Sequence, residues 1–166
     1  MSVVKTEEAI LAGGCFWGVE DLIRNIPGVI KTRVGYSGGA TEAPTYETVK
    51  KGMTGHAEAV KIIFDPTQVS FSALLDFFFK MHDPTTSNRQ GNDRGTQYRS
   101  AIFYSSEEQK LVAEQKIKEW NATQRWKAPI VTEVTKASSF FDAEDYHQDY
   151  LVKNPGGYTC HYWREF

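Results

Sequence analysis

The spacing of apolar side chains predicts strands and helices that alternate along the first half of the chain. Strands are predicted for residues 8–12, 29–36 and 58–64; in the second, apolar and polar positions alternate, with Ile30 to Tyr36 on one face. A helix is predicted to begin at Cys15 and to end at Pro27-Gly28, because the apolar residues between them recur at i, i+3 and i+4.

The second half of the chain continues the same alternation. Ser70 is predicted to cap a helix with one apolar face that ends at Pro84, and the Ser-Ser-Glu-Glu run at 105–108 predicts a capping box before a helix that reaches about Trp120. Strands are predicted for 100–104 and 130–134, a short helix for 144–149, and loops for 37–55 and 85–96. A loop as long as 37–55 inside a compact domain is usually functional or disordered.

This order of elements predicts the fold class. The succession β-α-β-β-α-β, then α-β, predicts an α+β protein: a ferredoxin-like two-layer α/β sandwich with a mixed sheet, an extra helix and strand, and an irregular C-terminal tail. No shift in composition divides the chain, so residues 1–166 are expected to form a single catalytic domain whose tail covers about 150–166.

Composition and charge exclude several classes of protein. Hydrophobic residues make up 40% and charged residues 24% of the 166 positions, as in ordinary globular domains. With 19 Lys and Arg against 21 Asp and Glu, the net charge of −2 excludes a general nucleic-acid binder. The first eight residues lack an apolar stretch long enough for a signal peptide, and no apolar run is long enough to cross a membrane. We therefore expect a cytoplasmic protein.

The two cysteines are the first candidates for chemistry, because thiols in a reducing compartment are more often catalytic or metal-binding than structural. Cys15 follows a predicted strand and two glycines and opens a helix, where free amides and the helix dipole are expected to lower the thiol pKa. The alternative is an inert, buried cysteine. Cys160 lies in the tail after Asn154-Pro155-Gly156-Gly157, either as a mobile reactive thiol or as a surface cysteine without function. One activated and one mobile thiol are typical of a redox cycle.

Glu58 is an unusual residue for its position. It shares a strand face with Val60, Ile62 and Phe64, so it is expected on the core side, where desolvation would keep it protonated; a frayed, exposed strand end is the alternative. A neutral carboxylic acid beside a cysteine is a proton donor rather than a base. Phe16 and Trp17 either pack in the core or form the wall of an apolar pocket, and the pattern alone does not decide between these.

The four histidines, His56, His82, His147 and His161, have spacings that fit no metal motif, so no metal is expected. Cys15 with His56 would allow nucleophilic catalysis on an amide or ester, as in a cysteine hydrolase, which leaves Cys160 idle.

Motifs along nearly the whole chain resemble one family. Gly14-Cys15-Phe16-Trp17-Gly18 is similar to the signature of the A-type peptide methionine sulfoxide reductases. Further similar motifs follow in the family's order: Gly35-Tyr36-Ser37-Gly38-Gly39, Thr45-Tyr46-Glu47-Thr48-Val49, Gly55-His56-Ala57-Glu58-Ala59-Val60, His82-Asp83-Pro84-Thr85, Gln90-Gly91-Asn92-Asp93, Gly95-Thr96-Gln97-Tyr98-Arg99-Ser100, Glu144-Asp145-Tyr146-His147-Gln148 and Asn154-Pro155.

The resemblance implies an activity and assigns site residues. It implies a peptide-methionine (S)-S-oxide reductase that reduces methionine S-sulfoxide, free and in proteins, and so repairs oxidised proteins. Cys15 would attack the sulfoxide sulfur and become a sulfenic acid, and Cys160 would then form a disulfide with it. Phe16 and Trp17 would form the pocket for the methyl group. Glu58 would give a proton to the sulfoxide oxygen, assisted by the hydroxyls of Tyr46 and Tyr98, and Asp93 would order the site near Tyr98.

The resemblance also implies the partners of the enzyme. Thioredoxin, or another dithiol, would reduce the disulfide, and no bound cofactor is expected; the protein is expected to be a monomer. Some relatives carry a second tail cysteine that passes the disulfide outward, whereas this tail has Cys160 alone, which implies a cycle with one resolving cysteine. Two other hypotheses stay open beside the reductase: the Cys15–His56 hydrolase, and a module that binds oxidised methionine without catalysis.

Overall fold

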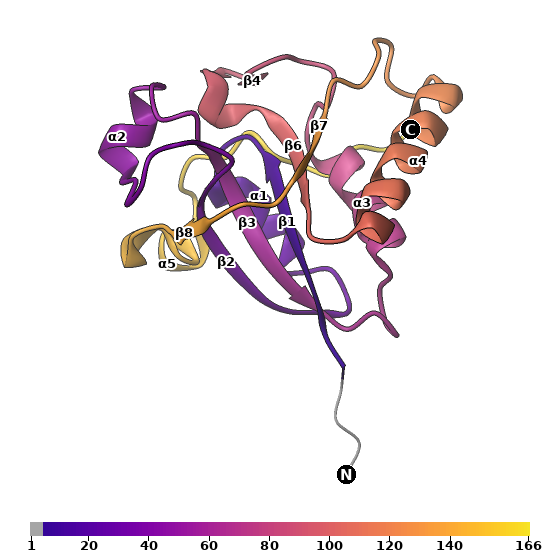
Figure 1. The fold of residues 1–166 in the computed structure, drawn as a ribbon, viewed down its shortest axis with the longest axis horizontal. Coiled ribbons are helices and arrows are strands. Elements are labelled where there is room, and N and C mark those ends of the chain that lie inside the picture. The colour runs from indigo at the N-terminus through magenta and orange to yellow at the C-terminus, as the bar shows by residue number, and fades with distance from the viewer. Residues whose placement is uncertain (1–4) are drawn as a thin grey trace.

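A six-stranded sheet forms the centre of the protein in a computed structural model that describes residues 5–166 (Figure 1). In chain order the elements are β1 (Glu7–Gly13), α1 (Phe16–Ile23), β2 (Val29–Ser37), α2 (Tyr46–Lys50), β3 (Ala57–Phe64), α3 (Phe71–Met81), β4 (Arg89–Gln90), β5 (Asp93–Arg94), the 3-10 turn η1 (Thr96–Tyr98), β6 (Ser100–Tyr104), α4 (Glu107–Thr123), β7 (Glu133–Lys136), β8 (Phe140–Asp142), the 3-10 turn η2 (Asp145–His147) and α5 (Tyr150–Lys153). The expectation that the first eight residues contain no signal peptide concerns residues 1–4 in part, and these four lie outside the described residues.

The strand order of the sheet is β7-β6-β1-β3-β2-β8. β1 pairs antiparallel with β3 and β6, and β2 pairs antiparallel with β3 and β8, whereas β7 runs parallel to β6. The α+β class and the mixed sheet predicted from the sequence are therefore confirmed. β4 and β5 form a separate two-stranded ribbon inside the segment predicted as a loop.

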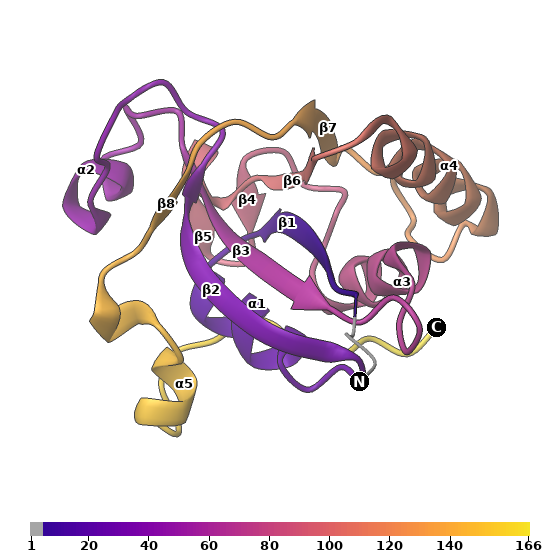
Figure 2. The ribbon, with the colours of Figure 1, turned by 60° about the horizontal axis from the view of Figure 1, so that its bottom comes forward.

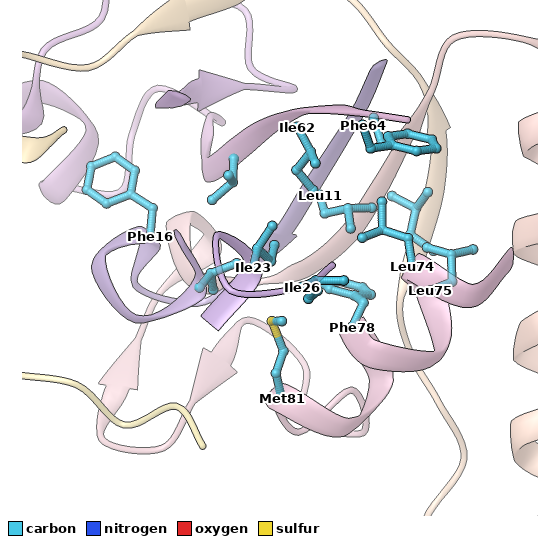
Figure 3. Close-up of a cluster of buried hydrophobic side chains, with 14 of the residues drawn as sticks. Leu11, Phe16, Ile23, Ile26, Ile62, Phe64, Leu74, Leu75, Phe78 and Met81 are labelled. Atoms are coloured by element: carbon cyan, nitrogen blue, oxygen red, sulfur yellow. The ribbon is translucent and has the colours of Figure 1, made fainter. Parts of the chain in front are cut away.

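One face of the sheet carries the main core (Figure 3). Leu11 of β1 and Ile62 of β3 pack toward Ile23 of α1 and toward Leu74 and Phe78 of α3, and all five are buried. Burial of such side chains stabilises the fold by about 1.5–3 kcal/mol each. Because α1 is fixed to this face through Val19 and Ile23, its N-terminus is held at one end of the central strands.

An extended segment of the chain, rather than a helix, covers the opposite face of the sheet. Small and apolar side chains of β1, β3 and β6 point to this side, and Ala137, which follows β7, and Phe140, the first residue of β8, pack against them. Figure 1 shows this segment crossing the sheet in front, while α1 lies behind it, and Figure 2 shows the same arrangement from below.

Capping residues fix the helices largely where the sequence predicts. The Ser70 side chain accepts the N–H of Ala73 at the start of α3, and Ser106 accepts the N–H of Gln109 at the start of α4. The N-cap is Ser106, one residue after the start of the predicted capping box, and the Gln109 amide oxygen accepts the N–H of Ser105 rather than that of the N-cap residue.

Four further details of the sequence prediction are wrong. The segment 37–55 contains the helix α2, which the Thr45 side chain caps through the N–H of Thr48. β8 was missed, and β7 begins at Glu133, later than predicted. Ile30 does not share the buried face of β2: it is 57% exposed, because the pairing register shifts between Val29 and Lys31. Short strands and bulges depend on contacts across the sheet, which local periodicity does not reveal.

The C-terminal tail is docked along the domain. The N–H of Arg164 donates to the carbonyl of Lys80, and the Phe166 ring lies against the Trp120 and Trp126 rings, 5.7 and 5.3 Å between centroids. In the part of the chain that the structure describes, no helix is long and apolar enough to span a bilayer.

Candidate active site

Cys15 is the N-cap residue of α1, as the sequence predicts. It is buried, and the preceding Gly14 has φ +101°, a conformation that favours glycine. A Cβ atom at Gly14 would lie 2.7 Å from both Cβ and Cγ of Gln90, so the glycine also lets the β4 strand approach the turn before Cys15. The thiol is thus held at the junction of β1, α1 and β4.

The predicted lowering of the Cys15 pKa is wrong for the protein without substrate. Burial raises the pKa of this thiol well above its ordinary value, and the Glu58 carboxyl raises it further. The backbone N–H of Trp17, in the first turn of α1, lowers the pKa as the helix argument expects, but burial outweighs this effect. The raised pKa therefore favours the neutral thiol at Cys15.

Glu58 lies beside the start of α1, on the second residue of β3. Its side chain is buried, and its Oε1 accepts the backbone N–H of Phe16 at 3.2 Å. Desolvation raises the pKa of this carboxyl to about 8, and the Phe16 N–H only partly offsets the shift. The predicted burial of Glu58 near Cys15 is confirmed and the exposed alternative is wrong, and the raised pKa favours the protonated form.

Tyr46 and Tyr98 come to the same region from two different elements. Tyr46 is the first residue of α2, and Tyr98 ends η1. Burial raises the pKa of Tyr46 to about 12 and that of Tyr98 still higher, and the negative charges that Glu58 and Cys15 carry when they ionise add to both shifts. Both phenols therefore stay protonated and can donate hydrogen bonds near the thiol and the carboxyl.

Phe16 and Trp17 have different surroundings. Phe16 is fully buried, with its ring 5.7 Å from that of Tyr36 at the edge of the core cluster (Figure 3). Trp17 is half-buried. Its indole stacks on the Tyr150 ring with 3.7 Å between the ring centroids, and its Nε1–H donates a hydrogen bond to His147 Nδ1 at 2.9 Å. The indole is thus held by two residues from the C-terminal part of the chain.

Glu144 and His147 are site residues that sequence reasoning missed. Glu144 Oε1 accepts the Tyr36 hydroxyl at 2.8 Å, and its Oε2 accepts the backbone N–H of Tyr46 at 3.0 Å, so this carboxylate ties α2 to the sheet. His147 is buried, and its ring lies 4.6 Å from that of Tyr46. Both belong to the Glu144–Gln148 motif noted above, but only the fold shows that this segment lies over the start of α1.

Cys160 and Asp93 meet at the β4–β5 turn. The Cys160 Sγ lies 4.0 Å from Oδ2 of Asp93 and 3.9 Å from the carbonyl oxygen of Gln90, and the Tyr158 hydroxyl donates to the same Asp93 oxygen at 3.2 Å. Burial, followed by the Asp93 charge, raises the pKa of the Cys160 thiol. The tail therefore brings Cys160 to the ribbon that also touches Gly14.

His56 is not placed to act as the histidine base of a cysteine hydrolase. His56 Nδ1 accepts the N–H of Gly39 at 3.1 Å, and its Nε2 lies 2.7 Å from the carbonyl of Thr41, so both ring nitrogens are bound to loop backbone. This observation contradicts the Cys15–His56 hypothesis. Among residues 5–166, no three or more His, Cys, Asp or Glu side chains are arranged to hold a metal ion.

Comparison with known sequences gives a match over almost the whole chain. The family described as Peptide methionine sulfoxide reductase matches residues 7–165. The peptide methionine sulfoxide reductase MsrA of Nocardia farcinica is 58% identical over 159 residues, which cover 96% of this chain and 91% of that protein. MsrA of Mycobacterium tuberculosis is 56% identical over 162 residues, 98% of this chain and 87% of that protein.

Solved structures have the same fold. The crystal structure of Mxr1 from Saccharomyces cerevisiae in reduced form has a TM-score of 0.92 at 39% identity, and the match covers 99% of this chain and 95% of that one. Methionine sulfoxide reductase A of Corynebacterium diphtheriae has a TM-score of 0.87 at 41% identity, covering 94% of this chain and 78% of that one. Mxr1 in complex with Trx2 has a TM-score of 0.68 at 26% identity, covering 99% and 94%.

Proposed function

The chain belongs to the peptide methionine sulfoxide reductase family and is a thiol-dependent methionine sulfoxide reductase; from this premise we propose how its own residues carry the reaction. Cys15 is the nucleophile, Glu58 the proton donor, and Cys160 the resolving thiol. The substrate is methionine S-sulfoxide, free and in proteins. The observation that carries this proposal is the hydrogen bond from the Phe16 N–H to Glu58, which places a buried, protonated carboxyl one residue from the thiol.

The first step needs a proton on the substrate oxygen. A sulfoxide sulfur is a weak electrophile until its oxygen is protonated or strongly hydrogen-bonded, and Glu58 with the phenols of Tyr46 and Tyr98 supplies these donors. As Cys15 Sγ bonds to the sulfoxide sulfur, Glu58 gives its proton to the oxygen and takes up the proton that the thiol releases. The raised pKa values of both groups suit this exchange, because each holds its proton until the substrate arrives.

Phe16 and Trp17 hold the methyl group of the sulfoxide in this proposal. Trp17 offers a half-exposed indole face that Tyr150 and His147 fix in place, while Phe16 closes the apolar floor behind it. A fixed aromatic wall orients the sulfur toward Cys15 without new ordering of side chains on binding. The hydroxyl group then passes from the methionine sulfur to Cys15 Sγ: the S–O and Sγ–S bonds break, an Sγ–O bond forms, methionine leaves, and Cys15 carries the oxygen as a sulfenic acid.

Cys160 completes the cycle. Its thiol attacks the Cys15 sulfenic acid, the S–S bond forms, the S–O bond breaks, and the thiol proton leaves with the hydroxyl group as water. A dithiol then reduces this disulfide by exchange and itself becomes a disulfide. We propose thioredoxin as that dithiol, which is supported by the likeness to the Mxr1 complex with Trx2. Asp93, 4.0 Å from Cys160, orders the resolving thiol.

Substitution of Cys160 by serine tests this assignment. Cys160→Ser is expected to form one methionine per protein from free methionine sulfoxide and then to stop, because its Cys15 sulfenic acid has no thiol partner within the chain. Turnover with thioredoxin is expected to fall at least about 100-fold relative to the unchanged protein. Methionine release with and without thioredoxin measures both numbers. Normal turnover of Cys160→Ser with thioredoxin would contradict the resolving function of Cys160.

Three finer statements belong to the same proposal. The order β6-β1-β3-β2, with α1 and α3 on one face, supports a ferredoxin-like two-layer unit to which the remaining elements are added. We also propose that the protein acts as a monomer with no bound cofactor. We place it in the cytoplasm, where a reducing environment keeps the dithiol partner in its active form.

A further inference from the structure

His161, which the proposed cycle does not use, is buried against the turn before Cys15. It is 6% exposed, although it lies five residues from the C-terminus. Its Nε2 lies 2.7 Å from the carbonyl oxygen of Gly13, the last residue of β1. Figure 2 shows the tail running from α5 past α1 toward α3.

The tautomer of His161 follows from its partners. A carbonyl oxygen only accepts, so Nε2 carries the hydrogen and donates it to Gly13, which leaves Nδ1 as an acceptor. The Cys160 Sγ lies 3.8 Å from this Nδ1. Burial lowers the pKa of His161 to about 4, and the ring therefore keeps this neutral form near pH 7. The His161 ring is therefore too weak a base to remove the thiol proton of Cys160 efficiently. Its effect on Cys160 is to orient the side chain.

Gly18 provides the surface on which this part of the tail rests. A Cβ atom at Gly18 would overlap His161 Nδ1 and Thr159 Oγ1, so an alanine there would push both residues away from α1. The Thr159 hydroxyl accepts the N–H of His161 at 3.1 Å, which fixes the backbone on either side of Cys160. A glycine in the interior of a helix is unfavourable for the helix itself, and here it makes room for the tail.

From this geometry we infer that His161, resting on Gly18 and bonded to Gly13, is a positioning residue that holds Cys160 beside Cys15 for disulfide formation. The inference rests on the proposed cycle and adds a residue to its second half. The tail is thus docked while both cysteines are free thiols. His161 has no part in the reduction of the sulfoxide itself.

The test separates the two halves of one turnover. Reduced protein is mixed with excess methionine sulfoxide without reductant, and methionine, free thiols and sulfenic acid trapped by a 1,3-diketone are followed in time. His161→Ala is expected to form methionine at the unchanged rate but to form the disulfide about tenfold more slowly, a change equal to about 1.4 kcal/mol in the barrier. Trapped sulfenic acid should rise accordingly.

Three further variants make this result specific. His161→Gln should restore part of the rate, because its side-chain amide can donate to the Gly13 carbonyl, and Gly18→Ala should slow disulfide formation without any change in the tail sequence. Tyr162→Ala is the matched control, since this neighbouring tail residue is 59% exposed and should leave both rates unchanged.

Each other outcome counts against the inference. Disulfide formation at the unchanged rate in both His161→Ala and Gly18→Ala would overturn it, and so would an equal slowing of both half-reactions, which indicates general loss of structure. If His161→Ala does not fold, Gly18→Ala decides alone. Failure of the unchanged protein to form any methionine would contradict the proposed function, and the inference would fall with it.

Discussion

Cys15→Ser is expected to abolish methionine formation, with a loss of more than about 10³-fold and no single turnover in the absence of reductant. A serine hydroxyl is a much poorer nucleophile toward sulfur, and it has no counterpart of the sulfenic acid that the cycle requires. The measurement is methionine released from free methionine sulfoxide, with thioredoxin for turnover and without it for the first event. Any methionine burst from Cys15→Ser would contradict the assignment of the nucleophile.

The control for Cys15→Ser is the comparison with Cys160→Ser in the same assay. Both substitutions exchange sulfur for oxygen in one side chain, but only the tail variant should retain the burst. Thermal unfolding of both variants shows whether the fold is intact, since Cys15 is buried and Cys160 is only half-buried. A loss of activity that matches a loss of folded protein would not support a chemical function for Cys15.

Glu58→Ala is expected to slow methionine formation by about 10² to 10⁴-fold, the usual contribution of a positioned acid. Glu58→Gln should lose considerably less, because an amide N–H can still donate a hydrogen bond to the sulfoxide oxygen. The relevant measurement is the rate of the first methionine formed, which does not depend on Cys160 or on thioredoxin. Equal losses in the two variants would contradict the donor function of Glu58.

The pH dependence of kcat/KM tests whether the proton on Glu58 is required for the reaction. Glu58 acts while it is protonated, and its pKa in the folded protein is about 8. The rate kcat/KM should therefore be constant below this pH and fall as pH rises through about 8; Glu58→Gln should lack that fall. Glu20→Gln is the matched control, because Glu20 is also buried and also has a raised pKa. Glu20 lies further along α1 and accepts hydrogen bonds from the Thr32 hydroxyl and the Asp149 N–H. The Glu20→Gln variant should keep the alkaline fall.

Local sequence signals located the reactive elements of this protein because the causes are local. The strand of residues 8–12, the glycine turn and the apolar helix face follow one another directly, so the N-cap position of Cys15 needed no tertiary information. Glu58 was found for a similar reason, since the alternation of β3 places it on the same face as Val60. Buried polar residues that break an apolar pattern are good indicators of chemistry.

The sequence patterns could not predict contacts between residues far apart in the chain. The pKa of Cys15 depends on burial by segments far along the chain, and the helix start alone predicted the opposite direction. The attachment of Trp17 to His147 joins residues 130 positions apart, and no periodicity connects them. The docked tail is similar: its glycines indicate a flexible segment, whereas the hydrogen bond of His161 to Gly13 fixes it.

The central claim is that Cys15 and Cys160 share one redox cycle driven by a sulfoxide, and mass spectrometry of the intact, reduced protein tests it most directly. After excess methionine sulfoxide is added without reductant, the account predicts a loss of about 2 Da as a Cys15–Cys160 disulfide, with one methionine released per protein. An unchanged mass with no methionine released would contradict it.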